Sequence, residues 1–168
     1  MYATTVTSIG RCSGPTPLVR PRAPVPVPPV TRDAFERLVV EAVALIPRRF
    51  RREMKNLALV VEEAPSRELL AEMDIEPPDS LLGLYQGTPL PERAWAHGNT
   101  LPDRITLFQR PIEDDCEGED EDEVRAVIGE TLIHEIGHYF GLSEEEIEEI
   151  EARYWRGETL GPDEDDEP

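Results

Sequence analysis

A histidine pair in the segment TLIHEIGHYFGLSEEE, residues 131–146, constrains this chain more than any other feature. His134 and His138 are two of only three histidines in 168 residues, and Glu135 directly follows the first. Apolar residues recur around them at helical spacing: Val124, Ile128, Leu132, Ile133, Ile136 and Phe140. This spacing predicts a long helix over about residues 120–139. Because residues four apart on a helix lie side by side, the two imidazoles project next to each other.

Two neutral imidazoles held one helical turn apart can chelate a zinc ion without closing a loop. Glu135 lies about 100° around the helix from His134, so it can reach a water on the metal without being a ligand. The H-E-x-x-H arrangement predicts that zinc lowers the pKa of its water. Glu135 then takes the proton as the hydroxide attacks a carbonyl, and passes it to the leaving amine. Two core histidines with satisfied hydrogen bonds would explain the same residues without metal, so a third ligand is decisive.

The sequence after the second histidine predicts a sharp chain reversal. Gly141 favours a helix stop, and a capping box that begins at Ser143 starts the next helix. The reversal brings Glu144 back toward the metal, and we predict it as the third zinc ligand. The acidic run also suits a helix N-terminus in the absence of any metal. Two other glutamates are alternative ligands, Glu145 and Glu148.

The remaining segments predict a small α+β domain. Helical spacing predicts an N-terminal helix that is capped by Thr31 or Asp33 and interrupted at Pro47. Short apolar runs predict three strands: LALVVEE from Leu57, LLGLYQG from Leu81 and RITLFQRP from Arg104. PRRFRREMKN is expected to be a basic turn or short helix, and another short helix is expected near residues 66–73. A dense acidic loop, EDDCEGEDEDE, then leads into the histidine-bearing helix.

The two ends of the chain differ in composition from this domain. Seven prolines crowd into residues 1–30, which favours extended polyproline conformation over a packed core. We predict a disordered arm there, with a ligand for a proline-binding groove as the alternative. The segment GPDEDDEP predicts an acidic disordered tail over residues 158–168. The folded domain therefore spans residues 31–157.

The charge and the cysteines limit the partners and the location. A net charge of −19 argues against nucleic acid and against anionic membranes, and favours basic or neutral partners. Cys12 and Cys116 cannot make a disulfide framework, and no signal-peptide pattern or membrane-length apolar run occurs. We therefore expect a cytoplasmic protein, monomeric by default.

Taken together, these segments resemble a known family. HEIGHYFGLSEEE, LLGLYQGTPLPER, LPDRITLFQRP and FERLVVEA are similar to the small bacterial metallopeptidase-like proteins described as minimal zincins, with a compact matrixin-like core, over about residues 33–152. The resemblance implies a mixed sheet with the active-site helix beneath it, zinc on His134 and His138, and Glu135 as the base. In the related pattern H-E-x-x-H-x-x-G-x-x-[HD], the third ligand stands where this chain has Glu144. No methionine follows the motif, so the methionine turn of true metzincins is absent.

These inferences predict a zinc-dependent peptidase that acts on peptides or unfolded protein segments. We expect ITLFQRP to form the sheet edge above the cleft, where an extended peptide could add as a strand. The alternative is a non-catalytic, zinc-stabilised interaction module whose acidic surface recruits a basic partner. Glu135 favours the enzyme, because a structural site has no use for a base. Tyr139 is expected to pack rather than act, and His97 to face solvent.

Overall fold

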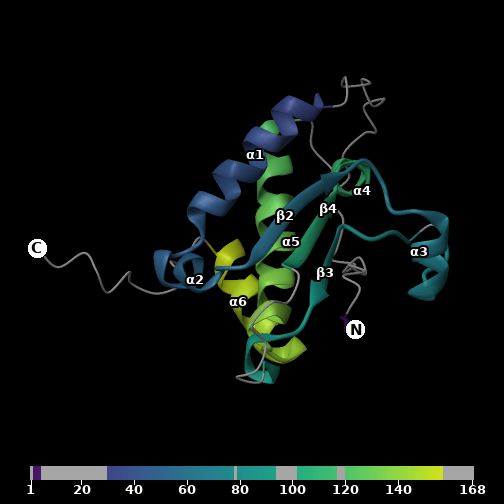
Figure 1. Cartoon of the computed structure of the whole chain (residues 1–168). Helices are drawn as coiled ribbons and strands as arrows, with labels where there is room; N and C mark the ends of the chain where they lie inside the picture. The colour runs from purple at the N-terminus through teal and green to yellow at the C-terminus, as the bar shows by residue number, and fades with distance from the viewer. Residues whose placement is uncertain (1, 5–29, 78, 94–101, 117–119, 157–168) are drawn as a thin grey trace, which may run out of the picture.

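The computed structural model describes residues 2–4, 30–77, 79–93, 102–116 and 120–156 (Figure 1). Within these segments a mixed sheet has the strand order β1-β3-β4-β2. The strands are β1 (Tyr2–Thr4), β2 (Leu57–Glu62), β3 (Gly83–Gly87) and β4 (Asp103–Phe108). β4 pairs parallel with β2 and antiparallel with β3, and β3 pairs antiparallel with β1. The predicted α+β class and the small mixed sheet are confirmed.

Helices connect and cover these strands. They are α1 (Arg32–Leu45), α2 (Arg48–Glu53), α3 (Arg67–Glu72), the 3-10 helix η1 (Leu90–Glu92), α4 (Gln109–Asp115), α5 (Glu121–Phe140) and α6 (Glu144–Trp155). Thr31 rather than Asp33 caps α1, since its hydroxyl accepts a hydrogen bond from the Ala34 amide. No helix in the described segments is long and apolar enough to cross a membrane.

The core lies between the sheet and α5. This helix runs along one face of the sheet, with α1 packed beside it (Figure 1). Tyr85, Ile105 and Leu107 project from the strands into this core and are fully buried or nearly so. The opposite face of the sheet is covered in part by α3, whose apolar side chains pack on Leu84 and Phe108. Most residues of α5 from Val127 to Tyr139 are buried, because the helix packs against the sheet, α1 and α6.

Two expectations about the segment RITLFQRP are wrong. The strand β4 ends at Phe108, and the next residues begin α4. Pro111 lacks the amide hydrogen that a sheet ladder needs but fits the first turn of a helix, and Gln109 donates a hydrogen bond to Glu113. β4 is also an interior strand, paired on both sides, so it does not form the sheet edge. Its near-continuous burial suits a central position.

The predicted domain boundaries stay a prediction. The acidic tail over residues 158–168 and most of the arm over residues 1–30 lie outside the described residues. Within the arm, Tyr2–Thr4 forms β1 on the edge of the sheet, which the sequence did not lead us to expect.

Candidate metal centre

α5 carries both motif histidines and ends where the chain must reverse. Gly141 adopts the left-handed conformation, with φ of +74°, and its amide hydrogen bonds to the carbonyls of Gly137 and His138. A residue without a side chain takes this conformation at little cost, so the helix stops here. Ser143 then caps α6 through the predicted capping box with Glu146. The chain therefore returns beside the end of α5.

This reversal brings three side chains together: those of His134, His138 and Glu144, whose potential ligand atoms lie within 4.8 Å of one another. The Glu144 carboxylate oxygens are 3.9 Å from His134 Nε2 and 3.7 Å from His138 Nε2. Ligand atoms of a tetrahedral zinc ion are about 3.3 Å apart, so these side chains would have to approach one another by up to about 1.5 Å to hold the ion. The alternative ligands Glu145 and Glu148 are exposed and lie outside this group.

The donor atoms in this group fit a cation. The Nε2 atoms of His134 and His138 are both buried and have no hydrogen-bond partner among the described residues. A buried polar atom without a partner costs about 1–3 kcal/mol, and native proteins keep few of them. Two such nitrogens facing the same carboxylate are explained if a metal ion supplies the missing partner. This set of two imidazoles and a carboxylate is one that zinc accepts.

Glu151 on α6 fixes the orientation of one imidazole. Its Oε1 lies 2.8 Å from His134 Nδ1. Because a carboxylate only accepts hydrogen bonds, Nδ1 carries the hydrogen and Nε2 presents its lone pair to the candidate centre. Sequence reasoning missed Glu151. It stands seven residues after Glu144, on the same face of α6, and that separation could have identified it.

Close packing holds α6 against α5. Ile147 is fully buried against Gly137, where an added Cβ would lie 2.5 Å from Ile147 Cγ1. The side chain of Tyr154 lies equally close over Gly129. Larger residues at these two glycines would push α6 away, and with it Glu144 and Glu151.

Glu135 points from α5 toward β3 rather than toward α6. Its carboxyl is fully buried, and a Cβ added at Gly83 would lie 3.0 Å from Glu135 Cγ and 3.2 Å from Oε1. Burial raises the pKa of Glu135 to about 8, opposed by the charge of His134. The nearby backbone amide of Tyr85 also opposes this rise in pKa. It lies outside hydrogen-bonding geometry, so both carboxyl oxygens lack a hydrogen-bond partner within the described segments.

The two imidazoles have different electrostatic surroundings. Burial lowers the pKa of His134, but the hydrogen bond to Glu151 and the neighbouring carboxylates outweigh it, so the net shift is upward. Burial, and then the charge of His134, hold the pKa of His138 below its usual value. His138 is therefore neutral at pH 7, as a metal ligand must be.

The hydroxyl groups of two tyrosines near the motif bind other partners. Tyr139 is buried, and its hydroxyl donates to the Glu53 carbonyl at 2.8 Å, so it packs as predicted. The Tyr85 hydroxyl donates to Asp103 at 2.8 Å. His97 lies outside the described residues.

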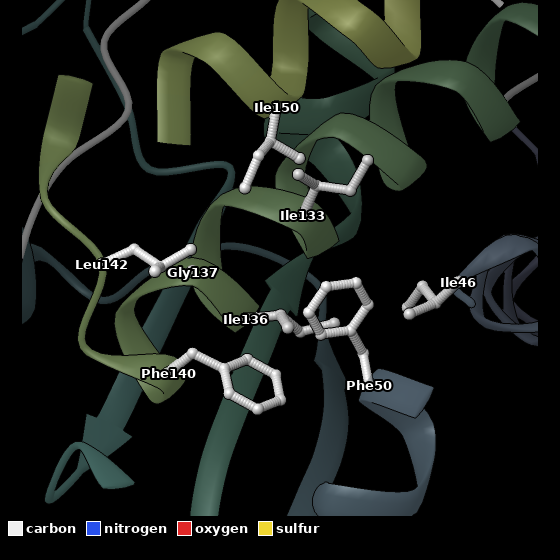
Figure 2. Close-up of a pocket in the computed structure, with 8 residues that line it drawn as sticks. All are labelled: Ile46, Phe50, Ile133, Ile136, Gly137, Phe140, Leu142 and Ile150. Atoms are coloured by element: carbon white, nitrogen blue, oxygen red, sulfur yellow. The ribbon is translucent and has the colours of Figure 1, made fainter. Parts of the chain in front are cut away.

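An apolar pocket lies on another side of α5 (Figure 2). Its lining combines Ile133, Ile136 and Phe140 of α5 with Ile46 and Phe50 from the end of α1 and from α2, together with Leu142 and Ile150. It contains no titratable side chain, so it offers no acid, base or ligand for a reaction.

The comparison with protein families agrees with this geometry. A family model described as zincin-like metallopeptidase matches residues 54–154. Among solved structures, one match is a conserved hypothetical protein from Thermo thermophilus, which is 25% identical. That alignment covers 66% of this chain and 94% of that chain, with a TM-score of 0.46. A search of curated proteins finds no match.

Proposed function

The chain belongs to the family of zincin-like metallopeptidases, and on that premise we propose that it is a zinc-dependent peptidase acting on flexible or unfolded polypeptide segments in the cytoplasm. The observation that carries the proposal is the pair of buried, unpartnered Nε2 atoms that converge with Glu144 beside Glu135. The cytoplasmic location depends on the sequence argument alone.

His134, His138 and Glu144 would hold the ion, and Glu151 would keep the His134 ring turned toward it. When bound, zinc would supply a water of lowered pKa and a positive charge that favours the ionised form of Glu135. The close approach of Ile147 to Gly137 would hold α6, and therefore the third ligand, in place.

Glu135 is the proposed general base. Its oxygens accept no hydrogen bond in the part of the chain that the structure describes, so they would be available to accept a proton from the attacking water. The same carboxyl would then return the proton to the leaving amine nitrogen as the peptide bond breaks. Because Gly83 has no side chain, the Glu135 side chain fits between α5 and β3. This close packing would restrict the movement of the Glu135 carboxyl.

The number of converging groups favours an enzyme over a structural zinc module. Structural zinc sites are almost always closed by four protein ligands, whereas catalytic sites use three and leave one position open. In the part of the chain that the structure describes, three groups converge. A structural module would also have no use for an unpartnered carboxyl at Glu135.

The test measures zinc content and hydrolysis of an unfolded protein for the wild type and for Glu135→Gln, with Glu148→Gln as a control at an exposed glutamate. Glu135→Gln should retain stoichiometric zinc and lose at least a factor of about 100 in turnover, the scale of general-base catalysis. The control should match the wild type. Equal turnover in Glu135→Gln and wild type would refute the enzyme.

A further inference from the structure

The edge of the sheet beside the candidate centre is covered by the protein's own N-terminus. β1 pairs antiparallel with β3 in the register Tyr2 to Gly87, Ala3 to Gln86 and Thr4 to Tyr85. β4 occupies the other side of β3. Without β1, this edge of β3 would present unpaired amide and carbonyl groups, which is the usual template for an added peptide strand.

β3 is also the strand closest to the proposed base. A Cβ at Gly83 would lie 2.6 Å from Thr131 Cγ2 and 3.0 Å from Glu135 Cγ, so α5 contacts this end of the strand directly. Because β1 is antiparallel to β3, its chain direction leads from Gly87 toward Gly83. An extended segment in this position therefore runs toward Glu135, as a bound peptide would.

β1 would have to leave this edge before a peptide could add to it. Of the described strands, β1 is the most weakly paired, with three residue pairs compared with six between β2 and β4. The candidate centre nearby is open on one side: His134 and His138 are 6% and 5% exposed, but the Glu144 side chain is 51% exposed.

The first ten residues have the composition of a strand. MYATTVTSIG has no charged side chain in a chain of net charge −19, and half of these residues are β-branched. The prolines of the arm begin only at Pro15. By composition this segment is an uncharged peptide, in contrast to the acidic chain as a whole.

We propose that Tyr2–Thr4 is an intramolecular inhibitory strand, which occupies the peptide-binding edge of β3. The inhibitory role rests on the proposed peptidase function, whereas the strand exchange can be measured without catalysis. A segment tethered to its own site has an effective concentration of about 1 mM. A free peptide with the same intrinsic affinity for β3 must therefore exceed about 1 mM to replace β1, and at lower concentrations it must bind β3 more tightly than β1 does.

The experiment compares three zinc-loaded proteins: the full chain, a variant lacking residues 2–9, and a variant lacking residues 17–24, which keeps β1 and removes the same length. The probe is a synthetic peptide of residues 1–9 with a fluorophore at its C-terminus, and its fluorescence anisotropy reports binding. The variant lacking residues 2–9 should bind the probe at least about tenfold more tightly than the other two. It should also hydrolyse unfolded protein faster.

Two full-length variants guard against a truncation that fails to fold. Ala3→Pro and Thr4→Pro each remove one backbone amide hydrogen, and one of these two residues directs its amide toward β3. That variant should bind the probe like the truncated protein, while the other should resemble the wild type. Equal probe affinity in all proteins, or binding to none of them, would overturn the proposal. If the loss of β1 increases probe binding but no protein hydrolyses the substrate, the exchange of β1 for a peptide is supported and the peptidase function is refuted.

Discussion

Replacing Gly83 with alanine tests the closest contact between the sheet and the proposed base. The new methyl group would lie 2.6 Å from Thr131 Cγ2, 3.0 Å from Glu135 Cγ and 3.2 Å from Glu135 Oε1. These distances are well below van der Waals contact, so α5 and β3 must separate or Glu135 must turn. Overpacking of this kind costs about 1–3 kcal/mol, which corresponds to a fall in Tm of about 3–12 °C for a domain of this size. A base displaced by about 1 Å can lose about 100-fold in turnover.

A double variant separates the two effects. Thr131→Ser removes the methyl group that causes the shortest contact and keeps the hydroxyl, which donates to the Val127 carbonyl at 2.8 Å. Gly83→Ala with Thr131→Ser should therefore recover much of the lost Tm in a thermal melt. Turnover should stay low, because the contact with Glu135 remains. Wild-type stability and wild-type turnover in Gly83→Ala alone would show that α5 and β3 do not approach this closely.

Three further predictions concern other parts of the chain. Glu144→Gln should weaken zinc binding at least about tenfold in competition with a chelator, whereas Glu145→Gln should not change it; equal affinities would reassign the third ligand. Glu151→Ala should weaken zinc binding about 10- to 100-fold while the far-ultraviolet circular dichroism is retained, because His134 Nδ1 loses its acceptor; unchanged affinity would contradict this role. Burial and then the surrounding carboxylates raise the pKa of the Cys116 thiol to about 12. Iodoacetamide, followed by mass spectrometry, should therefore modify Cys116 much more slowly than free cysteine at pH 8 and faster as the pH rises, and equal rates at pH 8 would refute the shift.

Features set by neighbouring residues are predictable from the sequence. The end of α5 at Gly141 and the cap at Ser143 depend on a few adjacent residues, as do the helical spacing of the histidines and the strand β2. These local signals are sufficient to place Glu144 near the two histidines, where the structure has it.

Features set by distant contacts are not predictable in the same way. The order of the strands places β4 in the interior of the sheet, and no pattern within RITLFQRP reports which strands flank it. The pairing of Tyr2–Thr4 with β3 joins residues that are far apart in the sequence. Glu151 reaches His134 only because of the way α6 packs on α5, and that packing depends on the contact between Ile147 and Gly137.

The candidate ligands and Glu151, which orients His134, all belong to residues 134–151, within one pair of consecutive helices. Separation of α6 from α5 would therefore break up the metal centre while the sheet remains folded. The rate at which the metal dissociates would then depend on this local opening rather than on global unfolding. Zinc should raise the free energy of that opening in proportion to the logarithm of its concentration. Native-state hydrogen exchange would detect this as zinc-dependent protection of α6 amides, with the amides of β4 unaffected.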